Sequence, residues 1–390
     1  MSALATPPLS LYVHLPWCVR KCPYCDFNSH VHMGPLPEAE YVAALLVDLE
    51  ADLPLATDRR VESVFLGGGT PSLFAPETLA TLFRGLRARL ELAPDAEITL
   101  EANPGTIEHG RFAGYAQAGI NRVSLGAQSF GARQLAALGR IHAAEDTGRA
   151  VAELAAASLS NFNLDLMYAL PEQTLTGALA DVEAALALAP RHLSHYQLTL
   201  EPGTAFHARP PLLPDEDLAF EMQLATHARL RHAGFAQYEV SAWALPGAEC
   251  RHNLNYWRFG DYLGLGAGAH GKLSDATSGT IRRTAKARQP RDYLARAARG
   301  DPLGSSEPVP AQQRPFEFML NALRLTAGFG AADFEARTGL PLATVAAPLE
   351  RLARRGLLAA AADGGWWQPT ELGLRFLNDL QLAFLPDARH

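Results

Sequence analysis

The sequence has no run of apolar residues long enough to cross a bilayer, no internal repeat and no low-complexity segment. A membrane-spanning helix needs about 20 mostly apolar residues, so we expect a protein that does not span a membrane. The first residues, MSALATPPLSLYVHLP, lack the basic start and the apolar stretch of a secretion signal. We therefore expect a cytoplasmic protein, with a large core drawn from the 48% of its 390 residues that are hydrophobic.

The chain also has fewer basic than acidic residues, with 34 Lys and Arg and 41 Asp and Glu, which gives a net charge of −7. The chain as a whole has no electrostatic footprint for nucleic acid, and we expect no nucleic-acid partner. The segment Ile281–Gly300 differs, with seven basic residues and one acid, Asp292. It is either a solvated helix face or a patch for phosphates, carboxylates or anionic lipid. Any membrane contact would be peripheral.

Cysteine is scarce, with four in the chain, yet Cys18, Cys22 and Cys25 lie within eight residues. In a reducing compartment such a group is more often a metal site than a set of disulfides. Zinc would need a fourth ligand, for which the candidates nearby are His14, His30 and His32. An iron–sulfur cluster held by three thiolates would leave one iron open for a small molecule. The single cysteine run favours the cluster.

Short apolar stretches alternate with helical patterns as far as Gly234. This alternation predicts an α/β fold with a parallel sheet, either doubly wound or closed into a full or partial barrel. The expected strands are Leu11–Pro16, Ser63–Gly67, Glu97–Ala102, Arg122–Gly126, Phe162–Met167 and His192–Thr199. The expected helices include Glu38–Leu53, Pro76–Leu90, Ala143–Ala157 and Leu175–Leu188.

The rest of the chain departs from this alternation. A strand-like stretch, Gln237–Ala244, leads into a Gly-rich and aromatic region. From Pro315 the pattern is three helices and a hairpin at Asp363-Gly364-Gly365, which predicts a small winged-helix-like α+β domain. We expect a core at residues 1–234, a connecting region at 235–310 and this C-terminal domain at 311–390.

The stretch YVHLPWCVRKCPYCDF resembles the radical S-adenosylmethionine (SAM) superfamily and, more narrowly, its oxygen-independent coproporphyrinogen III oxidase-like group. The resemblance covers nearly the whole chain and implies a partial (β/α)6 barrel. In that superfamily three cysteines bind a [4Fe–4S] cluster whose fourth iron chelates SAM. The resemblance therefore implies that Cys18, Cys22 and Cys25 are cluster ligands.

Further stretches, LGGGTP, LEANPG, LGAQSF, LGRIH and NLDLMYALP, recur in order after successive expected strands. Each alone would be ordinary scaffold. Together with the cysteine run, they imply by resemblance a SAM pocket. Its residues are Tyr12, Gly68, Gly69, Thr70, Glu101, Gln128, Arg140 and Asp165.

The group that the chain resembles has two branches, coproporphyrinogen oxidases and haem chaperones of the HemW type. The oxidases usually carry a fourth cysteine where this chain has Phe27, and a longer extension than the 17 residues before Cys18. The stretch HNLNYW, residues 252–257, matches the H-N-x-x-Y-W motif of the chaperones. The resemblance thus favours His252 as a haem ligand, between aromatic rings that suit a porphyrin face.

Three neighbouring features leave alternatives open. The haem propionates could meet Arg251, Arg258 or the basic segment after Ile281. Cys250 is either a small buried side chain, which we favour, or a thiolate haem ligand. His270, after LGLGAGAH, lies where the oxidases line the SAM site, and its role is open.

These observations lead to one leading hypothesis and two others. The first is a haem chaperone that delivers haem to respiratory proteins and holds a [4Fe–4S] cluster and SAM, with the cluster stabilising the fold or a homodimer. The second is an enzyme that cleaves SAM to a radical acting on coproporphyrinogen III or another tetrapyrrole. The third is a zinc-bound regulator that binds DNA through Arg351, Arg354 and Arg355.

Overall fold

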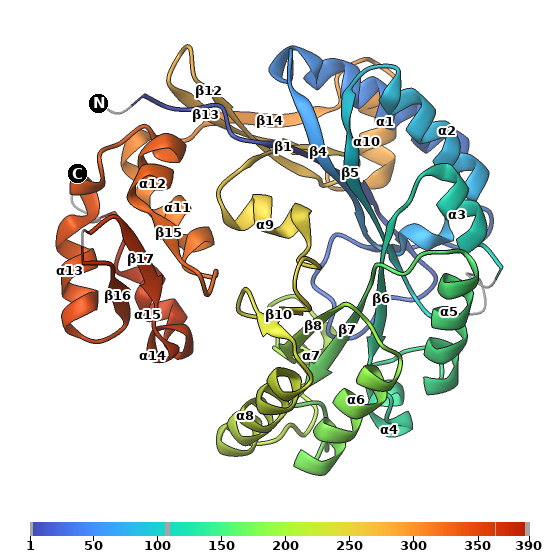
Figure 1. The fold of residues 1–390 in the computed structure, drawn as a ribbon. Helices are drawn as coiled ribbons and strands as arrows, with labels where there is room; N and C mark the ends of the chain where they lie inside the picture. Colours follow the sequence, from blue (N-terminus) through green and yellow to red (C-terminus); the bar gives the residue numbers. More distant parts are fainter. Residues whose placement is uncertain (1–2, 106–109, 363, 387–390) are drawn as a thin grey trace.

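The computed structural model describes residues 3–105, 110–362 and 364–386. Within them the main sheet has twelve strands in the order β14-β13-β12-β11-β1-β4-β5-β6-β7-β8-β10-β9. Strand β1 and strands β4 to β8 run parallel and curve into a partial barrel (Figure 1). The prediction of an α/β partial barrel is therefore confirmed.

The six barrel strands coincide with the six stretches expected from the sequence. They are β1 (Leu9–Leu15), β4 (Arg60–Gly68), β5 (Glu91–Ala102), β6 (Arg122–Gln128), β7 (Phe162–Tyr168) and β8 (His192–Gln197). Nearly continuous burial, as in β6 where all seven residues are buried, is the mark of parallel strands covered on both faces.

Helices cover the outer face of the barrel (Figure 1). They are α1 (Glu38–Asp52), α2 (Pro76–Arg87), α3 (Phe112–Ala118), α5 (Ala144–Ala156), α6 (Leu175–Ala187) and α8 (Glu216–His232). Their apolar side chains and those of the strands form one core that includes Leu45, Leu82, Leu100 and Leu164. Because the strands are parallel, their carboxyl ends meet at one edge, and the loops that follow them are brought together there.

The basic segment Ile281–Gly300 is a helix face only in its second half. It forms strand β13 (Thr280–Lys286) and then helix α10 (Pro290–Ala297). Strands β11 (Asp261–Leu265), β12 (His270–Asp275), β13 and β14 (Leu303–Pro308) extend the sheet beyond β1. Lys286 is buried and pairs with Asp48 at 2.6 Å and with Asp52 at 2.8 Å. The two carboxylates that pair with Lys286 lie more than 200 residues earlier in the sequence, so nothing near Lys286 in the sequence indicates that it is buried. The local pattern of basic residues therefore predicted a solvated side chain.

The stretch Gln237–Ala244 is also not a single strand. It divides into β9 (Ala236–Gln237) and β10 (Ala242–Ala244), which pair antiparallel across a turn. Helix α9 (Arg251–Trp257) follows and lies on the inner, concave side of the sheet (Figure 1). The motif HNLNYW is thus helical and points into the barrel region.

The C-terminal part contains the three predicted helices, α11 (Arg314–Ala322), α12 (Ala331–Thr338) and α13 (Ala346–Arg354). A small sheet in the order β15-β17-β16 completes it, from Phe329–Gly330, Trp366–Pro369 and Leu358–Ala360. Helices α14 (Glu371–Arg375) and α15 (Leu377–Leu382) follow. The winged-helix-like prediction is confirmed, although Asp363 of the expected turn lies outside the described residues.

The C-terminal part has its own apolar core, around Phe318, Phe334 and Leu352, and stands beside the open side of the barrel (Figure 1). This core also takes in Ile281 of β13. The domain limits at residues 234 and 310 stay predictions. In the described part of the chain, no helix has both the length and the apolar character to cross a membrane.

Candidate active site at the carboxyl edge of the barrel

The three clustered cysteines lie on the loop between β1 and α1, at the carboxyl edge of the barrel. They line one cavity of about 140 Å³. Thr70 Oγ1 donates to Cys18 Sγ at 3.5 Å, Arg140 Nη1 donates to Cys22 Sγ at 3.8 Å, and Cys25 Sγ lies 3.7 Å from Ser29 Oγ. Burial raises the pKa of Cys18, against the hydrogen bonds from Thr70 and Ser29. Each of the three sulfur atoms thus has a polar neighbour in the wall of the cavity.

These residues fit an iron–sulfur cluster better than zinc. The donor set is three sulfur atoms around one cavity, as for a cluster with one open iron. Among the described residues, no group of three His, Cys, Asp or Glu side chains is placed to hold a single metal ion. The histidines considered for zinc have other partners, since His14 Nε2 and His30 Nε2 face Asn28 and His32 Nε2 faces the Pro35 carbonyl.

Seven of the eight residues proposed for SAM line this same cavity: Gly68, Gly69, Thr70, Glu101, Gln128, Arg140 and Asp165. The eighth, Tyr12, lines a neighbouring cavity instead. The assignment of these residues to SAM stays a prediction, but the fold brings them together from four strands, β4 to β7, and, for Arg140, from the loop before α5. Their convergence is what a shared small-molecule site requires.

The glycines of LGGGTP are fixed by steric constraints. A Cβ at Gly69 would lie 2.5 Å from the Trp17 carbonyl oxygen, and Gly68 has a φ of +115° and faces the His14 ring. Only glycine fits both positions without moving the backbone. The cysteine loop can therefore pack directly against the end of β4, which places Cys18 next to Thr70.

Two buried carboxyl groups give the site its electrostatic character. Burial, followed by the charge of Asp165, raises the pKa of Glu101 to about 8. Burial also raises the pKa of Asp165, although the hydrogen bonds that its carboxylate accepts act in the opposite direction and lower the pKa. Glu101 Oε2 accepts from the Gly68 amide at 3.2 Å. A bound ammonium group or hydroxyl donor would relieve the cost of ionising these carboxyls.

The sequence analysis did not single out Asn103, Ser124 or Tyr196, which also line the cavity. Asn103 Nδ2 donates to Thr70 Oγ1 at 3.0 Å, and Tyr196 OH donates to Gln128 Oε1 at 2.9 Å. Asn103 follows Glu101 by two residues, so strand alternation could have placed both on one face. Nothing in the local sequence marks Ser124 or Tyr196.

A larger cavity of about 700 Å³ adjoins the first. The two share the lining residues Phe27, Gly68, Glu101, Ser124 and Asp165, so they are continuous. The larger cavity is closed by helix α9 and also contains the exposed side chain of His270. A ligand in it would therefore lie between the cysteine cavity and α9.

Helix α9 is held in place by polar contacts from several strands. Glu97 Oε1 accepts from the backbone amides of Arg251 at 2.9 Å and His252 at 3.4 Å, which satisfies the amino end of the helix. Asn255 Nδ2 donates to Ser10 Oγ and to the Asp261 carbonyl, both at 2.9 Å. This seven-residue helix is thus fixed by its surroundings.

His252 is buried within the wall of the larger cavity, at 8% exposure. Its Nδ1 lies 3.4 Å from Ser63 Oγ, and its ring packs 5.1 Å from that of Phe65. Burial, followed by the charge of Arg122, lowers the pKa of His252 to about 3. The imidazole is therefore neutral at physiological pH, which is the form that binds a metal.

The other residues near the motif are placed as follows. Cys250 is fully buried, with its Sγ 3.5 Å from Glu97 Oε1, so it is the small buried side chain that we favoured. Arg251 pairs with Asp95 and Glu62, and Arg258 is exposed. Neither arginine lines the larger cavity, whereas Arg283 and Arg288 of the basic segment do.

Comparison with known proteins agrees with this architecture. Residues 12–185 match the Radical SAM superfamily and residues 309–376 match the HemN C-terminal domain. The solved structure of coproporphyrinogen III oxidase (HemN) from Escherichia coli superposes with a TM-score of 0.82 at 23% identity, covering 97% of this chain and 90% of that one. The fold is therefore that of a radical SAM protein, and the three cysteines lie within the part of the chain that matches the superfamily.

Two proteins of high sequence identity show to which family within the radical SAM superfamily the chain belongs. Heme chaperone HemW of Escherichia coli is 50% identical over 98% of this chain and 99% of its own length. Heme chaperone HemW of Haemophilus influenzae is 48% identical over 98% and 99%. The chain belongs to the heme chaperone HemW family within the radical SAM superfamily.

Proposed function

We propose that this protein is a haem chaperone, which binds haem in the cavity closed by α9 and passes it to haem-requiring proteins. The observation that carries the proposal is His252, a neutral buried imidazole in the wall of a 700 Å³ cavity. Tyr256 and Trp257 of the same helix also line this cavity and provide flat apolar surface. A neutral imidazole is an ordinary axial ligand of haem iron.

The proposal includes two further cofactors. Cys18, Cys22 and Cys25 hold a [4Fe–4S] cluster, and Gly68, Gly69, Thr70, Glu101, Gln128, Arg140 and Asp165 surround SAM. Such a cluster, when reduced, supplies one electron. Arg140 Nη1 donates to Cys22 Sγ, and the glycines allow the ligand to approach the backbone. The position where the oxidases carry a fourth cysteine holds Phe27, whose side chain is 62% exposed.

Delivery of haem requires a surface for an acceptor, which we take to be a respiratory protein. Exposed apolar side chains gather on the loops after the barrel strands: Val19, Phe27, Val31, Met33, Ile141 and Leu212. Such a group marks a contact surface, and it suits an acceptor, a second copy of the chain or the surface of a membrane. We place this exchange in the cytoplasm.

One observation supports an enzymatic alternative. The cysteine cavity and the larger cavity share Glu101 and Asp165 in their walls. A tetrapyrrole in the larger cavity would therefore lie next to SAM. In this second function the protein would cleave SAM and modify coproporphyrinogen III or another tetrapyrrole.

The test is a haem titration of anaerobically reconstituted protein, followed by absorption, with His252→Ala and His270→Ala as a matched pair. Both histidines line the cavity, but His252 is buried and His270 is exposed. We expect a saturable Soret shift that His252→Ala weakens at least about 10-fold, as loss of a metal ligand would. Equal affinity in wild-type and His252→Ala protein would remove His252 from the site.

Absence of specific haem binding in the wild-type protein would reject the chaperone function. The alternative is then tested by incubation with SAM, a reductant and coproporphyrinogen III. Release of 5′-deoxyadenosine together with loss of propionate carboxyl groups would support the enzyme. Haem binding without release of deoxyadenosine would reject it.

A further inference from the structure

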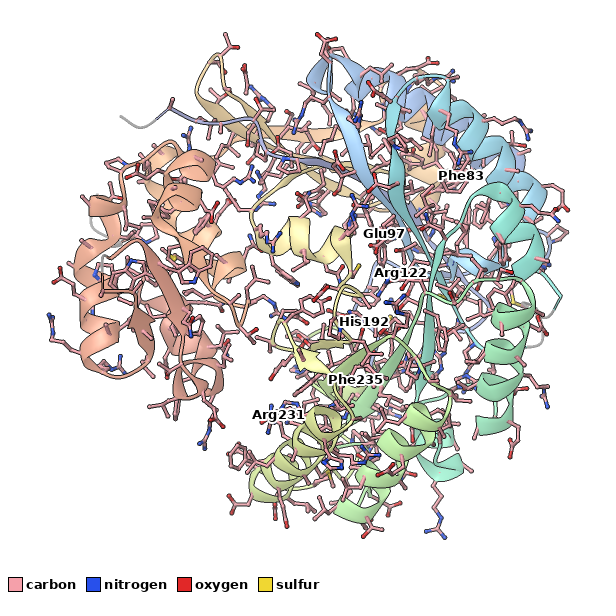
Figure 2. All side chains as sticks on the ribbon, in the orientation of Figure 1. Phe83, Glu97, Arg122, His192, Arg231 and Phe235 are labelled. Carbon is pink, nitrogen blue, oxygen red and sulfur yellow. The ribbon has the colours of Figure 1, made fainter. Side chains whose placement is uncertain are left out.

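Arg122 is the most deeply buried arginine side chain that lines the larger cavity. It begins strand β6 and is 2% exposed. Figure 2 shows Arg122 between Glu97 and His192 on the side of the sheet that faces α9. Its Nε has no hydrogen-bond partner, and the nearest carboxylate oxygen, Glu97 Oε2, is 3.8 Å away, beyond hydrogen-bonding distance. A guanidinium that is buried without a hydrogen bond is costly in free energy.

The carboxylates near Arg122 have other partners. Glu97 Oε1 accepts from the amides that begin α9 and from Cys250. Asp165 accepts from Ser124 Oγ at 3.2 Å and from Asn163 Nδ2 at 2.8 Å. Both carboxylates thus accept hydrogen bonds from other groups, and the one ion pair of Arg122 among the described residues is the long contact with Glu97 Oε2 at 3.8 Å. The N–H donors of the Arg122 guanidinium are therefore available to a ligand that enters the cavity.

Arg122 also lies close to the proposed iron ligand. Its positive charge contributes to the lowered pKa of His252 on one element and of His192 on another. His192 is engaged through both ring nitrogens, with Asn163 Oδ1 at 2.6 Å and Tyr238 OH at 2.8 Å. The same end of the cavity thus presents a neutral imidazole, which suits a metal, and a guanidinium, which suits a carboxylate.

We propose that Arg122 binds a carboxylate of the tetrapyrrole in this cavity, while His252 faces the iron. The inference rests on the proposed function and names Arg122 as the side chain that selects a porphyrin with carboxylate groups. Arginine is suited to this role because its donors form a fork that matches a carboxylate. Arg283, at the mouth, is already paired with Glu317 at 2.7 Å. Arg288, which also lines the cavity, is exposed, so Arg122 is the buried arginine of the cavity that has no hydrogen bond of its own to a described residue.

The test compares haem with haem dimethyl ester, in which both propionates are uncharged. In anaerobically reconstituted protein, Arg122→Gln is expected to weaken haem binding about 10- to 100-fold, the range for losing a charge-assisted hydrogen bond. The ester should bind weakly to both proteins with similar affinity. Arg122→Lys should fall between wild-type and Arg122→Gln protein for haem, because lysine keeps the charge but not the fork. Arg60→Gln, an exposed arginine, is the control.

Several results would overturn the proposal. Equal haem affinity in wild-type and Arg122→Gln protein would do so, and so would an equal loss for haem and ester, which indicates a structural role. Weaker SAM binding with unchanged haem binding would assign the carboxylate to SAM. If Arg122→Gln does not fold, equal affinity of the wild-type protein for haem and ester overturns the proposal. A wild-type protein that binds neither porphyrin rejects the proposed function as well.

Discussion

At the scale of single residues, the chemistry of this protein depends on groups whose charge is set by burial. His252 and Glu101 face connected cavities, yet one is held neutral by a lowered pKa and the other by a raised one. Burial favours the neutral form of both, so it acts in opposite directions on a base and an acid. These two groups are thus neutral before ligands enter, while positive charge in the cavity walls comes from Arg122, Arg140, Arg283 and Arg288.

The lowered pKa of His252 predicts a specific acid sensitivity. The pKa is about 3 in the folded protein and about 6.5 when unfolded. Between these values the unfolded chain binds a proton that the folded chain does not, so stability is lost as pH falls. Between about pH 7.5 and about pH 5, wild-type protein should lose about 2 kcal/mol more of its free energy of unfolding than His252→Gln.

Urea unfolding of both proteins at the two pH values measures this difference. His270→Gln is the control, because His270 is exposed at the cavity mouth and should change the pH dependence less. An equal loss of stability in wild-type and His252→Gln protein would mean that His252 is protonated freely in the folded state. The cavity wall would then be open to water at that point.

At the scale of elements, α9 illustrates how a short helix is made stable by contacts outside it. Seven residues are too few for an independent helix in water. Glu97 on β5 accepts from its first amides, and Asn255 connects it to β1 and to the start of β11. The orientation of His252 therefore depends on residues from three strands of the main sheet.

This dependence predicts that Asn255→Ala lowers the free energy of unfolding by about 2 kcal/mol, because two partly buried hydrogen bonds lose their donor and leave the buried Ser10 hydroxyl and Asp261 carbonyl without it. Haem affinity should fall with it, since His252 is no longer held. The matched control is Asn253→Ala on the same helix, whose side chain makes no hydrogen bond to a described residue. Chemical unfolding of both variants measures the difference, and equal stabilities would contradict this account of α9.

At the scale of the whole molecule, the C-terminal part makes contacts with helix α9 and with the segment before it. Arg324 pairs with Glu239 at 3.1 Å and lies over the Trp257 ring at 4.4 Å. Arg283 and Glu317 form a second ion pair between β13 and α11. The last residue of HNLNYW is thus held by a side chain from the C-terminal part.

Breaking the first contact should destabilise the protein. Arg324→Gln would leave the Glu239 carboxylate, 6% exposed, without its cation, at a cost of about 2 kcal/mol. Arg354→Gln breaks an ion pair on α13 whose partners are 73% and 64% exposed, and should cost no more than about 0.5 kcal/mol. Thermal unfolding compares the two. Equal effects would show that the Arg324 contact adds nothing to stability.

The sequence by itself determined the alternation of strands and helices up to Gly234 and the cysteine loop at the carboxyl edge of the sheet, whereas the partial barrel was implied by the family resemblance. These features follow from local patterns, since apolar periodicity sets each strand and helix. The six barrel strands were predictable for this reason. So was the convergence of the strand-end motifs, because parallel strands share one edge.

Only the tertiary structure decided which groups pair inside the barrel. Lys286 is buried in a strand because Asp48 and Asp52 pair with it there. The stretch Gln237–Ala244 forms two strands because its second half, β10, pairs antiparallel with both β8 and β9. Arg122, Glu97 and His252 come from separate parts of the sequence, and no local pattern relates them. Burial and unsatisfied donors are properties of the packed molecule, so the carboxylate site at Arg122 was visible only in the fold.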